Sequence, residues 1–152
     1  MLGPLASIET AAAALANVYD ATLGDGLADL RRMPSVIIDE GPQRAVHRYH
    51  PTAPEREDGP PVLLVPPLAA PAICFDLRRG CSVAEHLLSQ GRRTYLVDYG
   101  PINFADRALG LEHWIEDVVP QAIHAASEDA GGRPVRVVGW CLGGIMASLA
   151  VA

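Results

Sequence analysis

The chain has 152 residues, of which 49% are hydrophobic and 20% charged, and its formal net charge is −6 at pH 7. These values are typical of a globular domain with a buried core and exclude a disordered chain. An acidic chain without a cluster of Lys and Arg also excludes nucleic acid as a ligand, because neutralising phosphates requires cations. Its cysteines, Cys74, Cys81 and Cys141, fit neither a disulfide framework nor a zinc site. Free thiols are typical of a reducing compartment, so we expect a cytoplasmic protein without a metal.

No membrane-directing segment is predicted. Residues 1–5 lack a basic n-region, and Glu9 interrupts the apolar run that follows, so we expect no signal peptide. Residues 137–152 are uncharged, but they fall short of the ~18–20 residues of a membrane-spanning helix. This C-terminal stretch is therefore predicted to be buried in the protein.

Residues 1–33 are predicted to form an N-terminal helical segment. A stripe of apolar residues at helical spacing predicts an amphipathic helix over 7–23 that packs against the main domain. The stripe consists of Ile8, Ala12, Leu15, Tyr19 and Leu23.

Residues 34–152 are predicted to form the main domain, of α/β class. Two strands, 36–38 and 44–50, flank a Gly-Pro turn, and a Pro-rich loop follows them. Short apolar runs then alternate with helical segments, which predicts right-handed crossovers and a parallel-sheet core with helices on both faces. The expected strands are 62–65, 94–97 and 135–138, and the expected helices are 82–91, 111–127 and 142 onward. Ser82 and Glu85 predict a capping box at the start of the first of these helices.

Residues 139–143 read Gly-Trp-Cys-Leu-Gly, a G-x-C-x-G pattern between an expected strand and an expected helix. This is the nucleophile-elbow pattern of α/β hydrolases, with Cys in place of Ser. A strained turn lifts the sulfur above the sheet edge, and Gly139 and Gly143 let strand and helix approach closely. The helix N-terminus favours the reactive thiolate. We therefore interpret Cys141 as a nucleophile; the alternative is an inert core cysteine.

Two backbone N–H groups are predicted to form the oxyanion hole. The N–H of Leu142 directly follows the nucleophile and points to where the oxyanion would form. The second donor is expected in the loop after strand 62–65, which begins with two prolines that have no N–H. Leu68 is the first residue there that can donate, with Ala69 next.

The pattern implies further catalytic groups. In this fold the nucleophile is followed by an acid and then a His, but the eleven residues after Cys141 contain neither. The sequence also ends within an apolar helix without a C-cap, so we expect an incomplete α/β-hydrolase fold, truncated after the elbow helix. His113 and His124 are predicted to be solvent-exposed, opposite a buried stripe that begins at Leu111. Asp98, at the active edge, is predicted to order a loop.

Several blocks of sequence, in their order and spacing, carry a family resemblance over about residues 60–152. They are residues 62–67, 75–77, Ser82 with Leu87, Gly91 with 95–100, and 139–144. Together they resemble the poly(3-hydroxyalkanoate) synthases and their synthase-like α/β-hydrolase relatives.

The resemblance implies an acyltransferase. In that family the elbow cysteine, here Cys141, is acylated by an (R)-3-hydroxyacyl-CoA, and repeated transfers extend a polyester. It implies no cofactor other than the coenzyme A thioester substrate, and a homodimer or a synthase partner subunit as protein partner. The family's triad Asp and His would lie beyond residue 152, so we expect the chain as given to be an incomplete fragment that is inactive as a synthase by itself.

Two other readings stay open. Dienelactone hydrolases also carry a G-x-C-x-G-G elbow, but blocks 75–77 and 97–100 favour the synthase-like family. A non-catalytic partner module is the other alternative, because a sheet that ended here would expose an edge and a half-covered helix. Preference for an acyl-CoA over a dienelactone separates the two enzymes, and acylation separates both from the module.

Overall fold

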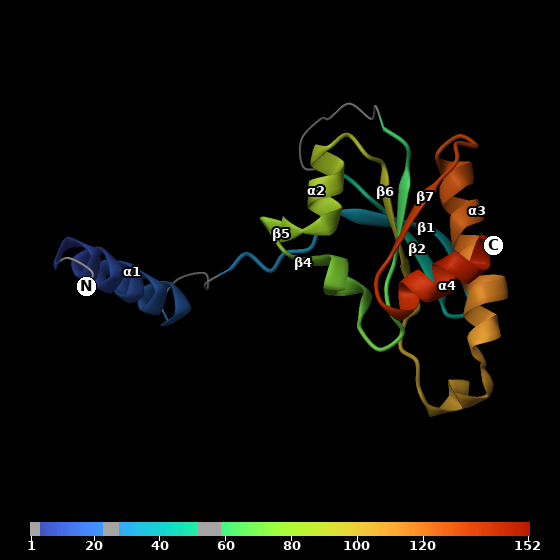
Figure 1. Cartoon of the computed structure of the whole chain (residues 1–152), viewed down its shortest axis with the longest axis horizontal. Coiled ribbons are helices and arrows are strands. Elements are labelled where there is room, and N and C mark those ends of the chain that lie inside the picture. The colour runs from blue at the N-terminus through green and yellow to red at the C-terminus, as the bar shows by residue number, and fades with distance from the viewer. Residues whose placement is uncertain (1–3, 23–27, 52–58) are drawn as a thin grey trace. The chain divides into compact units, whose positions relative to one another are not determined.

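The computed structural model describes residues 4–22, 28–51 and 59–152, with side chains from residue 10 onward. The chain divides into two compact units, Met1–Arg31 and Arg32–Ala152. Figure 1 shows the elements of both units along the chain.

The first unit contains one helix, α1 (Pro4–Thr22), among its described residues. The predicted helix over 7–23 is therefore confirmed within one to three residues at each end. Leu15 and Tyr19 of the predicted stripe are exposed, whereas the side chains of Ile8 and Leu23 lie outside the described residues. The predicted packing of this stripe stays a prediction.

The second unit is built on a five-stranded sheet in the order β1-β2-β6-β3-β7. Its strands are β1 (Ser35–Gly41), β2 (Arg44–Tyr49), β3 (Val62–Val65), β6 (Thr94–Asp98) and β7 (Arg136–Gly139). The strands β6, β3 and β7 are parallel, as predicted. The sheet as a whole is mixed, because β1 and β2 form an antiparallel hairpin that pairs with β6 through β2. Only two residues join β1 to β2, and so short a connection can link only antiparallel strands.

Helices cover both faces of the sheet, which confirms the α/β class. The 3-10 helix η1 (Ala72–Phe75) and α2 (Val83–Ser89) pack on one face. The other face is covered by η3 (His113–Val118), α3 (Val119–Asp129) and α4 (Leu142–Ala150). Figure 1 shows α2 on one side of the strands and α3 with α4 on the other.

The alternation of side chains along β3 explains the two cores. Leu63 and Val65 point into the core beneath α3 and α4, whereas Val62 and Leu64 point into the core beneath α2. All four side chains are buried. Successive residues of a strand face opposite sides of a sheet, so an uninterrupted apolar run is what a doubly covered strand requires.

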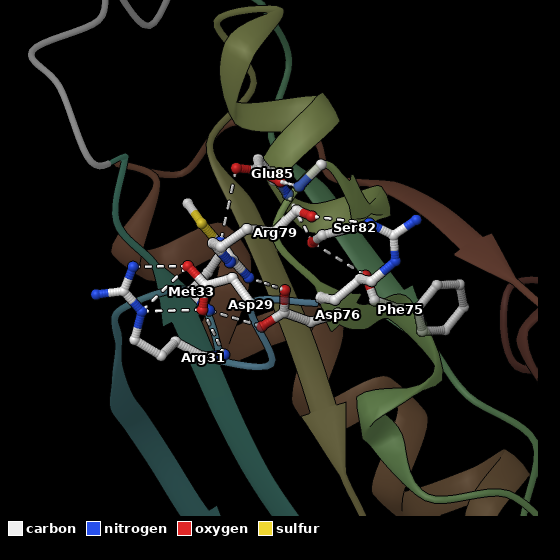
Figure 2. A network of polar contacts seen from close by, with 10 residues as sticks. Asp29, Arg31, Met33, Phe75, Asp76, Arg79, Ser82 and Glu85 are labelled. Atoms are coloured by element: carbon white, nitrogen blue, oxygen red, sulfur yellow. Dashed lines mark hydrogen bonds and ion pairs between the residues drawn. The ribbon is translucent and has the colours of Figure 1, made fainter. Parts of the chain in front are cut away.

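A buried carboxylate organises a small hairpin that the sequence did not predict. This hairpin consists of β4 (Asp76–Arg78) and β5 (Cys81–Ser82). Asp76, only 1% exposed, accepts hydrogen bonds from the Met33 backbone N–H (2.8 Å) and from the Arg79 guanidinium (2.5 Å). Figure 2 shows the Asp76 carboxylate with Met33 and Arg79 beside it, and both hydrogen bonds as dashed lines. The carboxylate therefore ties the segment before β1 to the hairpin.

The predicted capping box is only half formed. The Ser82 hydroxyl accepts from the Glu85 backbone N–H (3.0 Å) and caps α2 as expected. The Glu85 carboxylate, however, accepts from the Gly80 N–H (2.7 Å), in the tip of the hairpin (Figure 2). The hairpin turn presents this N–H to the carboxylate, so Glu85 joins helix to hairpin.

The helix predicted over 111–127 differs most from its prediction. It contains a π-helical segment, η3, that ends two residues before Pro120, whose ring disrupts the regular hydrogen-bond pattern one turn earlier. The wider π turn places Trp114, 4% exposed, in the core and leaves Leu111 exposed. The prediction of an exposed His113 is therefore wrong, because this side chain is half-buried against the Trp114 ring. The prediction is confirmed for His124, whose side chain is 70% exposed.

Candidate active site

Cys141 occupies a sharp turn between the end of β7 and the start of α4. Its backbone has φ 54° and ψ −124°, and it is one of two described non-glycine residues with positive φ. Such a conformation is costly for a residue with a Cβ and persists only where the surrounding structure imposes it. The Cys141 side chain is exposed. The turn therefore presents the thiol to solvent at the carboxyl edge of the parallel strands.

The two glycines that flank this turn are required by close backbone contacts. A Cβ on Gly143 would lie 2.3 Å from the Val65 carbonyl oxygen, and a Cβ on Gly139 would lie 2.5 Å from the Gly144 Cα. Both distances are far below any normal contact. The start of α4 thus packs directly against the end of β3 and against β7, as the G-x-C-x-G pattern predicted.

Further contacts fasten the turn to the neighbouring loops. The Trp140 backbone N–H donates to the Val65 carbonyl oxygen (3.2 Å), which continues the β7–β3 pairing into the turn. The Trp140 ring meets the buried Phe75 ring edge to face, with centroids 6.5 Å apart. These contacts with β3 and η1 therefore fix the position of the turn and hold the strained Cys141 backbone from two sides.

The predicted oxyanion donors lie on the two loops that this arrangement brings together. Leu142 is the first residue of α4, so its N–H has no partner within the helix. Leu68 follows β3 by three residues and is half-buried. Among the described residues, neither N–H donates to a protein acceptor. Both N–H groups follow the carboxyl ends of β3 and β7, which are adjacent and parallel, and their role as oxyanion donors stays a prediction.

A cavity of about 170 Å³ opens beside Leu68. It lies between the loop after β3 and the loop after β6, and its lining includes Asp98 and Tyr99. Asp98 Oδ1 accepts from the Gly100 N–H (2.9 Å), which confirms the predicted loop-ordering role.

Tyr99 is a residue of this region that the sequence did not single out. Its hydroxyl donates to the Pro66 carbonyl oxygen (3.0 Å) and so joins the loops after β6 and β3. Burial raises the pKa of the Tyr99 phenol above its ordinary value of 10.0. The available sequence signal was a Tyr directly after a buried strand, but the Pro66 carbonyl to which it donates is 33 residues away in the sequence.

The other titratable groups do not join Cys141. No hydrogen bond or ion pair involves the Cys141 sulfur within the described part of the chain. The same residues contain no group of three or more His, Cys, Asp or Glu side chains that could hold a metal ion. No described helix is both long and apolar enough to cross a membrane.

Comparison with known proteins finds relatives of this chain. The poly(3-hydroxyalkanoate) polymerase subunit PhaC of Allochromatium vinosum is 28% identical over 135 residues, which are 83% of this chain and 38% of that protein. The chain resembles the poly(3-hydroxyalkanoate) synthases. The PhaC subunits of Haloferax mediterranei and Cupriavidus necator are 27% and 29% identical over 77% and 60% of this chain. The resemblance predicted from the sequence blocks is thereby confirmed, although no family model matches.

This chain matches only part of the length of each relative. It spans about two fifths of the Allochromatium protein, 23% of the Haloferax protein and 16% of the Cupriavidus protein. The matched region is thus a minor part of each of these polymerases.

Proposed function

We propose that this chain carries the nucleophile of a poly(3-hydroxyalkanoate) synthase-type acyltransferase, built on an α/β-hydrolase fold, and that Cys141 is this nucleophile. The observation that carries the proposal is the backbone of Cys141, held at φ 54° on a strand–helix turn with its thiol exposed. Strain of this kind is concentrated at functional sites. The sequence similarity to PhaC proteins supports the same assignment.

The proposed chemistry is a thioester exchange. The Cys141 thiolate attacks the carbonyl carbon of a 3-hydroxyacyl-CoA, and the backbone N–H groups of Leu142 and Leu68 stabilise the resulting oxyanion. The intermediate collapses as the bond to the coenzyme A sulfur breaks, and the proton lost from Cys141 ends on the released thiol. One thioester replaces another, so the step is close to isoenergetic. A hydroxyl of a second acyl group then attacks the carbonyl carbon of the acyl-cysteine, an ester forms as the bond to the Cys141 sulfur breaks, and the hydroxyl proton ends on the released Cys141 thiol.

The test compares two classes of acyl donor. We expect 3-hydroxybutyryl-CoA to acylate the wild-type chain in one stoichiometric step that releases one free coenzyme A thiol per acylated chain. Repeated turnover is not expected, because residues 142–152 contain neither of the expected triad partners. A dienelactone should react more slowly, and Cys141→Ala should abolish both reactions while Cys74→Ala leaves them intact.

Two results would contradict the proposal. Faster reaction with the dienelactone would indicate a hydrolase of the dienelactone type. A folded chain that reacts with neither donor would indicate a partner module without catalysis.

A further inference from the structure

A groove lined by arginines and prolines lies at the amino ends of the parallel strands β3 and β7. Residues 60–61 lead into β3, and residues 133–135 lead into β7. Together with Gly59 and Arg136 they line a space of about 400 Å³, which is within the range of about 300–1,000 Å³ of ligand pockets. Figure 1 shows the loop before β7 at one end of this strand and α4, which follows Cys141, at the other. The groove is therefore separate from the candidate active site.

The guanidinium of Arg133 is held in place by backbone carbonyl oxygens. Its Nε–H donates to the Ala130 carbonyl oxygen (3.0 Å), and an Nη1–H donates to the Gly59 carbonyl oxygen (3.3 Å). These bonds use two of the five N–H donors of a guanidinium, and a carbonyl does not neutralise the charge. The wall of the groove thus carries a fixed cation that can still donate to an anion.

Two further arginines belong to the same region. Arg92 packs on Gly59, where an added Cβ would lie 2.3 Å from the Arg92 Nη1. Arg136 lines the groove and is exposed. Within the described part of the chain, no carboxylate forms an ion pair with Arg92, Arg133 or Arg136. A cleft lined by charges of one sign attracts ligands of the opposite sign, even though the whole chain has a net charge of −6.

We propose that this groove binds an acidic peptide segment of a partner protein, with its carboxylates on the arginines and its backbone along the prolines. A guanidinium matches a carboxylate through two parallel hydrogen bonds. The proline rings at positions 60, 61 and 134 supply apolar surface between the cations, which a peptide covers and a bare phosphate does not.

The spacing of the arginines fits an extended peptide. Arg133 and Arg136 are three residues apart, and an extended stretch of three residues reaches at most about 11 Å. Acidic residues two or three positions apart in an extended peptide have a similar reach. The inference does not depend on the role of Cys141.

Two other anionic partners fit less well. Affinity for nucleic acid depends on neutralising several phosphates, and the net negative charge of the chain opposes this. An anionic membrane attracts basic residues that lie close to a broad surface, whereas these arginines surround a groove.

Fluorescence anisotropy with the full chain tests the groove. The probe is a labelled octapeptide that alternates Glu and Ser, and the control peptide has Gln in place of every Glu. We expect the Glu peptide to bind saturably at low ionic strength and the Gln peptide to bind about tenfold more weakly, because its hydrogen bonds to the arginines lack the second charge. Added salt should weaken binding of the Glu peptide.

Three variants locate the binding. Arg92→Ala and Arg136→Ala should each weaken binding of the Glu peptide about tenfold. Arg107→Ala removes the same charge from an exposed site on η2 (Phe104–Ala108), beyond the carboxyl end of β6, and should bind the peptide as the parent does. The Arg136 side chain makes no hydrogen bond or ion pair among the described residues, so Arg136→Ala should unfold in urea as the wild type does.

Several results would overturn the inference. Equal affinities for the two peptides, or an equal loss in Arg107→Ala, would show that the arginines of the groove do not recognise carboxylates. Tighter binding of an oligothymidylate of the same length, or of phosphatidylserine vesicles, would assign these arginines to nucleic acid or to a membrane instead. Cys141→Ala should bind the Glu peptide as the wild type does, so a failure of the proposed function does not affect this result.

Discussion

Replacing Gly143 with Ala tests whether the close approach of α4 to β3 holds the Cys141 turn. The added Cβ would lie 2.3 Å from the Val65 carbonyl oxygen and 2.5 Å from the Pro66 carbonyl oxygen. Both neighbours are backbone atoms, so the start of α4 has to move by several tenths of an ångström. Overpacking of this kind costs about 1–3 kcal/mol. The shift would also weaken the Trp140 N–H bond to Val65, which contributes about 1 kcal/mol.

One favourable effect opposes these costs. Ala in a helix is preferred over Gly by up to about 1 kcal/mol. We therefore expect Gly143→Ala to lower the free energy of unfolding by about 1–3 kcal/mol, measured from urea unfolding curves.

Gly144→Ala is the matched control, because its nearest contact would be the Gly139 carbonyl oxygen at 3.1 Å. This variant should stay within about 1 kcal/mol of the wild type. A Gly143→Ala protein as stable as the wild type, or a control that loses as much, would refute the packing argument.

Three further substitutions test other parts of the structure by the same unfolding measurement. Ser82→Ala removes the N-cap of α2 and should cost about 1 kcal/mol, whereas Ser89→Ala in the last turn should cost less. Asp76→Ala leaves the buried Met33 N–H without its acceptor and should cost about 1–3 kcal/mol, and a neutral outcome would show that the hairpin does not depend on this carboxylate. Tyr99 has a raised pKa, so the stability that its protonated phenol contributes is complete below pH 10 and is lost as the pH rises further. Tyr99→Phe should therefore have a lower free energy of unfolding than the wild type at neutral pH. Between about pH 8 and about pH 11, its free energy of unfolding should fall by less than that of the wild type. An equal fall in the two proteins would contradict this role of the Tyr99 phenol.

The elements with strong local signals could be predicted from the sequence. The run 62–65 is apolar at every position because β3 is buried on both faces, and α2 starts at a Ser that caps it. The turn at Cys141 was predictable for a similar reason. Its two glycines are dictated by backbone contacts that any version of this turn would have.

The remaining features depend on contacts between distant segments. Asp76 reads as a surface carboxylate until Met33, 43 residues earlier, supplies its donor. The hairpin β4–β5 is too short to show alternation. The π turn at η3 shifts Trp114 and His113 off the helical period, and a period of 3.6 residues therefore assigned His113 to the wrong environment.

Contacts between distant segments also decide which parts of the candidate site the sequence could not predict. The strand–turn–helix pattern indicated Cys141 and the loop that contains Leu68, but the cavity between this loop and Asp98 arises only when β3 and β6 lie side by side. Tyr99 and Phe75 contribute by contacts across separate loops. No local pattern records such contacts.

Site-resolved acylation of the wild-type chain tests the central claim most directly. Cys141 and Cys81 are both exposed, so Cys81 is an internal control for the intrinsic reactivity of a thiol. After incubation with 3-hydroxybutyryl-CoA, peptide mass spectrometry would measure the acylated fraction at each cysteine over time. We expect the acyl group to accumulate at Cys141 well before Cys81. Equal rates at the two cysteines, or acylation of Cys81 alone, would contradict it.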